Sequence, residues 1–200
     1  MTRLRLSAPV LTLWAAAVAE RAGHPWEAAL TFGQRIAAMF AQSKGRSLGV
    51  FEAPEETPEH EARRARERAG TFPVPVFGTS VLARHDPSPA GGGRALAASG
   101  AGVASPSAAA SYLRRAFGER LPDATAALKR LAAAVPADEL AQPHVAYRLY
   151  CRIRPQVPLG VAGWGARGAF DLAAVRALAE HLEKGGTAAA EGSEGGGAAE

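Results

Sequence analysis

The residues best placed for chemistry are basic side chains that lie beside glycines. Lys44 and Arg46 stand in the segment 42–49 (QSKGRSLG), which follows a helical pattern. We place them just past the carboxyl end of that helix, where the helix dipole favours cations. We predict that they contact phosphate groups. The alternative is a charged helix end without a ligand.

A second glycine-flanked segment, 163–168 (GWGARG), matches the dinucleotide pattern G-x-G-x-x-G before a helix. That interpretation needs a strand–helix–strand unit, and a low-complexity tail follows the helix instead. Arg167 and the backbone N–H groups at a helix start are still suited to hold a phosphate. We favour a tight turn in which Trp164 packs against the helices and Asp171 caps the last one.

The overall charge fits an anionic partner without requiring one. The formal charge is +4, and residues 185–200 hold three acids and no basic residue. The first 184 residues therefore carry 23 basic and 16 acidic side chains, a charge of +7. Such a body is compatible with binding a polyanion. The predicted anion-binding or nucleic-acid-binding residues are Lys44, Arg46, Arg114, Arg115 and Arg167.

Catalytic and metal-binding patterns are weak. The five histidines are scattered, without the spacing of a metal motif, and there is no nucleophile elbow, P-loop or matched carboxylate pair. The single cysteine, Cys151, forms no intrachain disulfide, which favours a reducing cytoplasm. We predict no catalytic residue, metal or cofactor, and an enzyme is not the favoured class.

Two apolar helices within residues 7–49 are predicted to form an N-terminal helical hairpin. Trp14 lies on the apolar stripe of the first helix and Phe40 on that of the second. Gly33 allows close approach to Ala15 and Ala19 opposite. Two alternatives are a DNA-binding helix-turn-helix, whose second helix offers few base-reading side chains, and a cleaved signal peptide, which would expose the second stripe. We favour the structural interpretation.

The rest of the chain predicts a single, mainly α domain over residues 1–184. Residues 53–70 are a charged helix or linker, and valines on either side of Gly78-Thr79 predict one small β-hairpin. We expect a flexible loop at 86–105, further helices at 107–118, 122–135, 136–155 and from 171, and a disordered acidic tail at 185–200. No apolar run is long enough to span a membrane.

Two pairs of segments resemble a family of small bacterial proteins of unknown function. The first pair is 28–33 (AALTFG) leading to 42–49, and the second is 154–158 (RPQVP) leading to 163–168. The similarity covers residues of about 10–52 and 72–180. It implies a cytoplasmic bacterial protein and adds no activity, cofactor or partner.

These patterns lead to two hypotheses. The first is a nucleic-acid-binding or regulatory module whose basic, glycine-flanked segments contact phosphates, with binding that weakens as salt rises. The alternative is a non-catalytic interaction or assembly subunit whose apolar helical face pairs with a protein partner or a second copy.

Overall fold

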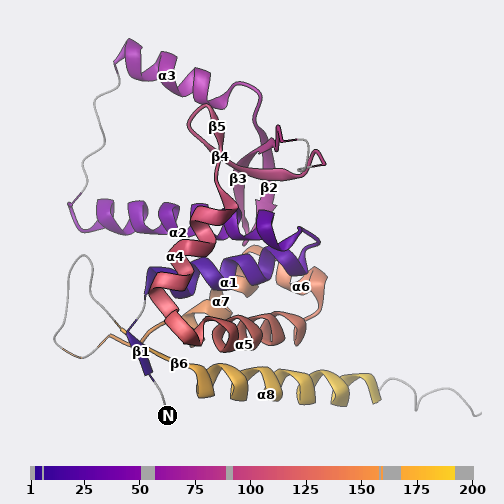
Figure 1. Cartoon of the computed structure of the whole chain (residues 1–200). Coiled ribbons are helices and arrows are strands. Elements are labelled where there is room, and N and C mark those ends of the chain that lie inside the picture. The colour runs from indigo at the N-terminus through magenta and orange to yellow at the C-terminus, as the bar shows by residue number, and fades with distance from the viewer. Residues whose placement is uncertain are drawn as a thin grey trace, which may run out of the picture.

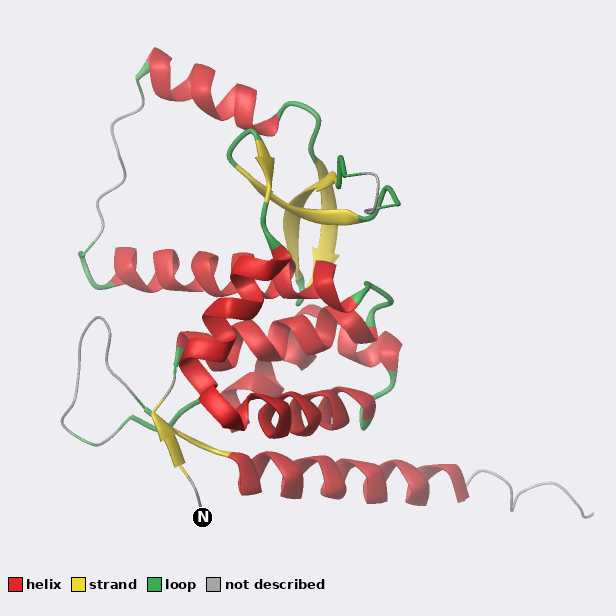
Figure 2. Ribbon diagram, in the orientation of Figure 1, coloured by secondary structure: helices red, strands yellow, loops and turns green. Residues whose placement is uncertain are grey.

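The computed structural model describes residues 3–5, 7–50, 57–88, 92–157, 159 and 168–191. The fold is mainly helical, as predicted, with antiparallel strands (Figures 1 and 2). The helices are α1 (Ala8–Arg21), α2 (Trp26–Ser47), α3 (Pro58–Arg68), α4 (Pro106–Phe117), α5 (Leu121–Ala133), α6 (Ala137–Ala141), α7 (Pro143–Ile153) and α8 (Leu172–Glu191), with a 3-10 turn at Gly118–Arg120. The strands are β1 (Arg3–Arg5), β2 (Phe72–Val76), β3 (Thr79–His85), β4 (Ala95–Ser99), β5 (Gly102–Val103) and β6 (Ala169–Asp171).

Helix α1 forms the centre of the core. Every residue from Val10 to Ala19 is buried, so the helix is covered on all sides rather than on the single face that its pattern predicts. Helices α2, α4, α5, α6 and α7 pack around it. The indole Nε1 of Trp14 donates a hydrogen bond of 3.0 Å to the Ala146 carbonyl on α7, which satisfies the one polar group of this buried side chain.

Gly33 brings α2 against α1, as predicted. A Cβ atom at Gly33 would lie 2.3 Å from the Thr12 carbonyl oxygen and 3.1 Å from the Ala16 Cβ. The residues opposite are therefore Thr12 and Ala16 rather than the predicted Ala15 and Ala19. Only a residue without a side chain fits at this distance.

The carboxyl end of α2 lies further along the chain than the sequence pattern indicates. Gly49, with φ of 67°, is the left-handed residue that closes the helix. The Val50 N–H donates to the Gly45 carbonyl at 2.9 Å, and the Gly49 N–H to the Arg46 carbonyl at 3.0 Å. These are the paired bonds of a Schellman motif. Lys44 and Arg46 therefore lie within the last turns of α2, not past its end.

The predicted β-hairpin corresponds to β2 and β3, which are part of a larger, four-stranded antiparallel sheet in the order β2-β3-β4-β5. Val76 pairs with Thr79, so the turn between β2 and β3 is Phe77-Gly78, one residue before the predicted Gly78-Thr79. The prediction of a flexible loop at 86–105 is wrong for β4 and β5. Their segment is rich in small residues, yet Leu96 and Ala97 are buried.

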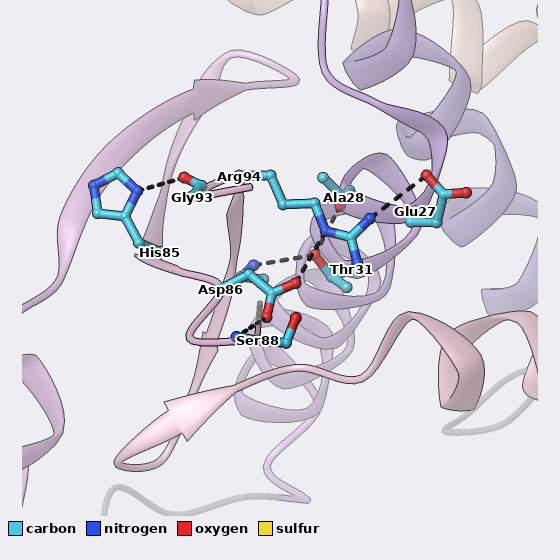
Figure 3. A network of polar contacts seen from close by, with 9 residues as sticks. Glu27, Ala28, Thr31, His85, Asp86, Ser88, Gly93 and Arg94 are labelled. Carbon is cyan, nitrogen blue, oxygen red and sulfur yellow. Dashed lines mark hydrogen bonds and ion pairs between the residues drawn. The ribbon is translucent and has the colours of Figure 1, made fainter. Parts of the chain in front are cut away.

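The connection between β3 and β4 is closed by polar contacts (Figure 3). The Asp86 N–H donates to the Arg94 carbonyl at 2.8 Å, and the Arg94 Nε donates to the Asp86 carboxylate at 3.0 Å. The backbone N–H of Ser88, followed by Arg94, holds the pKa of Asp86 below its usual value. Arg94 also lies 3.9 Å from the carboxylate of Glu27 on α2, so the loop is tied to the helical body.

The sheet is anchored on α2 through one buried hydroxyl. Thr31 Oγ1 donates to the Ala28 carbonyl at 2.7 Å within its helix and accepts a hydrogen bond of 3.0 Å from the Ala97 N–H of β4. The sheet and α3 consequently lie on one side of α2, while α1 and α5–α8 lie on the other (Figure 1). Helix α2 separates the two parts of the molecule.

The first and the last strand pair with each other, although they are far apart in the sequence. Strand β1 pairs with β6, with Leu4 opposite Phe170, a pairing that the sequence does not predict. Asp171 accepts a hydrogen bond of 3.0 Å from the Ala173 N–H, the capping role predicted for it. Helix α8 continues to Glu191, beyond the predicted domain end at residue 184; residues 192–200 lie outside the described residues.

Candidate anion-binding cleft

An arginine-lined cleft of about 500 Å³ lies between α2, α3 and the sheet. Its lining residues include four arginines and one glutamate, a net charge of +3. Leu82 on β3 and the turn between β4 and β5 complete the walls. The charged residues of this arginine cleft are Arg35 and Arg46 on α2, Arg64 and Arg68 on α3, and Glu67.

Helical periodicity explains why these arginines share the cleft. Arg35 and Arg46 are eleven residues apart, which is three turns to within about 20° and roughly 16 Å along the α2 axis. Arg64 and Arg68 are one turn apart on α3, at the i,i+4 spacing of neighbours on one helix face. Two arginines of α2 and two arginines of α3 therefore line the cleft, and the pair on α2 is more widely spaced.

None of the residues of α3 is buried in the core. The position of this helix therefore depends on hydrogen bonds at its carboxyl end. The guanidinium of Arg84, on β3, donates a hydrogen bond of 2.9 Å to the Glu67 carbonyl. The Thr71 hydroxyl donates to the Arg68 carbonyl at 2.7 Å. Both bonds satisfy carbonyl groups of the last turn, where the helix dipole is negative. Arg84 therefore positions Arg64 and Arg68 over the cleft.

The start of α3 follows the helix alternative predicted for residues 53–70. The Thr57 hydroxyl accepts a hydrogen bond of 3.3 Å from the His60 N–H, and Pro58 occupies the first turn. Acidic side chains lie in the first turn and arginines in the last, as the macrodipole favours. The arginines at the carboxyl end of α3 therefore both stabilise this exposed helix and give the cleft its positive charge.

The acidic member of the cleft is partly engaged elsewhere. The Glu67 carboxylate lies 4.0 Å from Arg63, its i−4 neighbour, with both side chains about half exposed. Such a pair is weak in water. Arg35, Arg46 and Arg68 are exposed while Arg64 is half-buried, so an incoming anion meets guanidinium groups that need little desolvation.

The structure brings one of the five predicted basic residues into this cleft. Arg46 lines it, whereas Lys44, two residues earlier on α2, projects from another side of the helix. Arg114 and Arg115 are exposed on α4 and do not line the cleft. Arg167 and Trp164 lie outside the described residues, so whether the two glycine-flanked basic segments meet stays a prediction.

Phe40 is half-buried and joins helix α7 to the sheet. Its ring stacks on Tyr147 at 5.7 Å between centroids and meets the edge of Phe77 at 6.0 Å. Burial raises the pKa of Tyr150, the next tyrosine on α7, to about 12, so its phenol stays neutral. The two tyrosines belong to a core edge, as their helical spacing indicates.

Sequence reasoning missed Arg35, Arg64 and Arg68. Residues 63–68 contain four arginines, but the nearby acids Glu61 and Glu67 reduce the net charge of this stretch in the sequence. The spacing of these arginines along each helix is the sequence feature that indicates a shared site. Arg64 and Arg68 lie on one face of α3, and Arg35 and Arg46 lie on one face of α2. Their convergence depends on how α3 packs on the sheet, which no local pattern states.

Other functional classes find no support in the described residues. No group of three or more His, Cys, Asp or Glu side chains is suited to hold a metal ion there. None of the described helices combines the length and apolar character needed to cross a bilayer. Thr31, a position where a helix-turn-helix would present a base-reading side chain, is buried against β4.

Comparison with known proteins identifies no relative. No protein-family model, curated protein or solved structure matches this chain.

Proposed function

We propose that this protein binds nucleic acid by its phosphate backbone, through the arginine cleft. The observation that carries the proposal is the convergence of four guanidinium groups, from two helices, on one cleft of net charge +3. Guanidinium pairs with phosphate oxygens through two parallel hydrogen bonds, which favours arginine at such contacts.

The length of the cleft supports a chain of phosphates over a single small phosphate. The backbone positions of Arg35 and Arg46 are roughly 16 Å apart along α2, a span that suits several phosphates of one strand. Adjacent phosphates of a nucleic-acid strand offer a repeating partner over that distance. Arg35, Arg46 and Arg68 are exposed, and contacts from such groups to the phosphate backbone carry no base-sequence information.

Salt dependence is the expected signature of this binding. Each phosphate contact made by Lys or Arg contributes about one unit to the slope of log affinity against log salt. We expect a slope of about −3 to −4 if all four arginines engage. Lys44, Arg114, Arg115 and Arg167 stay predictions as further contacts, which would steepen the slope.

The test compares two paired variants that remove the same charge inside and outside the cleft. Fluorescence anisotropy of a labelled single strand and a matching duplex is measured over ~25–200 mM KCl, a range in which phosphate contacts weaken strongly. We expect Arg64→Gln/Arg68→Gln to lower affinity at least tenfold and to reduce the slope by about two. The control, Arg148→Gln/Arg152→Gln, removes the same charge from exposed positions of α7 outside the cleft and should change affinity much less.

Two results would overturn the proposal. One is the absence of binding to either nucleic acid at the lowest salt. The other is an equal loss in both variant pairs, because that outcome would indicate a general charge effect rather than a site. Circular dichroism of all variants verifies that α3 and the body remain folded.

The assembly alternative lacks a specific observation in its favour. The large apolar side chains that are exposed in the described part lie on separate segments rather than along one helical face. They are Leu48 and Val50 after α2, Leu82 on β3, Tyr147 on α7, and Val157 and Leu159 after α7. Light scattering of the pure protein distinguishes the two: a stable oligomer without nucleic-acid binding supports the alternative.

A further inference from the structure

A second cavity, of about 560 Å³, lies where three segments distant in sequence meet. They are the end of α1 with the turn that follows it, the tip of the β2–β3 hairpin, and α6. We name it the hairpin cavity. Its volume falls within the roughly 300–1,000 Å³ typical of small-molecule sites, and it lies at a junction between two parts of the fold, where such sites are frequent.

The walls of the hairpin cavity are apolar. Val18 of α1, Val76 of β2 and Leu140 of α6 line it, and each is a buried core residue. They are at most 4% exposed, so the surface open to a hydrocarbon or aromatic group comes mainly from the exposed lining residues Ala22, Pro75, Ala137 and Ala141. None of these side chains offers a hydrogen-bond partner. Any polar part of a ligand must therefore be held elsewhere in the cavity.

Arg21 and His24 supply the polar part, at the turn between α1 and α2. Arg21 is exposed, and no described acidic residue forms an ion pair with it. The His24 ring is half-buried and meets the edge of the Phe32 ring at 5.0 Å between centroids. Burial lowers the pKa of His24, so the imidazole is neutral near pH 7 and Arg21 is the cation of the site.

The backbone of Phe77 is a second, independent observation at the same place. Among the described residues it is the one non-glycine with positive φ, 56°, and it lines the hairpin cavity. A two-residue turn of this kind favours Asn or Gly, and a bulky residue there is an outlier. The Phe77 side chain is nevertheless 95% buried, against Phe40. Backbone strain of this kind is frequent at ligand-binding sites, where the surrounding contacts stabilise the strained conformation.

We propose that the hairpin cavity binds a small amphipathic carboxylic acid, with the carboxylate at Arg21 and the apolar body against Pro75, Ala137 and Ala141. The guanidinium fork matches a carboxylate, and the apolar walls match an alkyl or aryl chain. This proposal does not depend on nucleic-acid binding, because the arginine cleft shares no lining residue with the hairpin cavity.

The test titrates octanoate into the ¹⁵N-labelled protein and follows amide shifts by NMR. We expect saturable shifts at Val18, Val76 and Leu140, at roughly millimolar concentrations as suits a ligand of this size. Octanol lacks the carboxylate and acetate lacks the chain, so each should bind at least fivefold more weakly than octanoate.

Three variants locate the site. Arg21→Gln should weaken octanoate at least fivefold and leave octanol unchanged, whereas Arg64→Gln, the same substitution in the arginine cleft, should alter neither. Ala137→Leu, at an exposed position of the cavity wall, should block both ligands. The proposal is overturned if octanoate shifts no cavity amide, if octanol binds as tightly as octanoate, or if Arg21→Gln leaves octanoate affinity unchanged.

Discussion

Replacing Gly33 with Ala tests the contact that holds the two long N-terminal helices together. In an exposed helix the same substitution is stabilising, because Ala gains about 1 kcal/mol over Gly in helix propensity. At Gly33 the added Cβ would lie 2.3 Å from the Thr12 carbonyl oxygen and 2.9 Å from the Ala16 amide nitrogen. Both atoms belong to the α1 backbone and cannot rotate away.

The magnitude follows from the movement required. Restoring an ordinary 3.4 Å contact with the Thr12 oxygen needs a local separation of 1.1 Å, in a helix buried on all sides. Overpacking a core costs about 1–3 kcal/mol, and a backbone clash belongs at the upper end. After the propensity gain we expect a net loss of about 2 kcal/mol. For a chain of this length that lowers Tm by about 4–8 °C.

Urea unfolding and thermal melts, followed by circular dichroism at 222 nm, measure this change. Gly102→Ala is the matched control, because a Cβ there would have only the Ser99 carbonyl oxygen nearby, at 3.8 Å. Its φ is not positive, so the substitution should be close to neutral. A Gly33→Ala protein at least as stable as the parent would refute the close packing of α1 and α2.

Three further changes test other contacts. Thr31→Val leaves the buried Ala97 N–H without its acceptor and should cost about 1–3 kcal/mol in urea unfolding, while Thr31→Ser retains most of the stability. Trp14→Phe removes the bond to the Ala146 carbonyl and should cost at least about 1 kcal/mol; a neutral result would contradict that bond. Because burial lowers the pKa of His24, the unfolded chain takes up its proton first as the pH falls below about 6.5. Stability should therefore decline with falling pH, and less so in His24→Gln; equal losses between pH ~7 and ~5 would refute this linkage.

Local signals predicted the helices well and the sheet poorly. Periodic apolar residues and flanking Pro and Gly placed α1, α5 and the starts of α2 and α8 close to their observed bounds. Residues 136–155 contain two helices instead of the one predicted, because Pro143 forces Gln142 into an extended conformation with ψ of 136°. The rule for residues before proline would have found this break.

Strands β4 and β5 were missed for a different reason. The segment 95–99 (ALAAS) lacks the alternation of a half-buried strand and the β-branched residues that favour one. Its conformation comes from tertiary contacts instead, namely pairing with β3 and the bond from Ala97 to Thr31. The pairing of β1 with β6 likewise joins three-residue segments from opposite ends of the chain, too short for any periodic signal.

The candidate site was predictable only in part, because it depends on how one exposed helix is fastened. Arg46 followed from charge and position at the end of α2. Arg64 and Arg68 join it because Arg84 holds the last turn of α3, through a bond between residues 17 apart in sequence. The Nε atom of Arg84 is buried without a described hydrogen-bond partner. The cost of removing this N–H group from water therefore offsets part of the stabilisation that the bond to Glu67 provides.

Helix α2 explains why the two proposed sites should respond differently to their ligands. Its residues 28–33 are all buried, whereas most of its residues beyond Ala37 are exposed. The arginine cleft lies along this outer part and beneath α3, which has no buried residue and can open without unfolding the core. The hairpin cavity is lined by core residues such as Val18 and Leu140. An anion in the cleft should therefore slow hydrogen exchange mainly in α3, whereas a ligand in the hairpin cavity should stabilise the whole fold, because the cavity exists only when the core is formed.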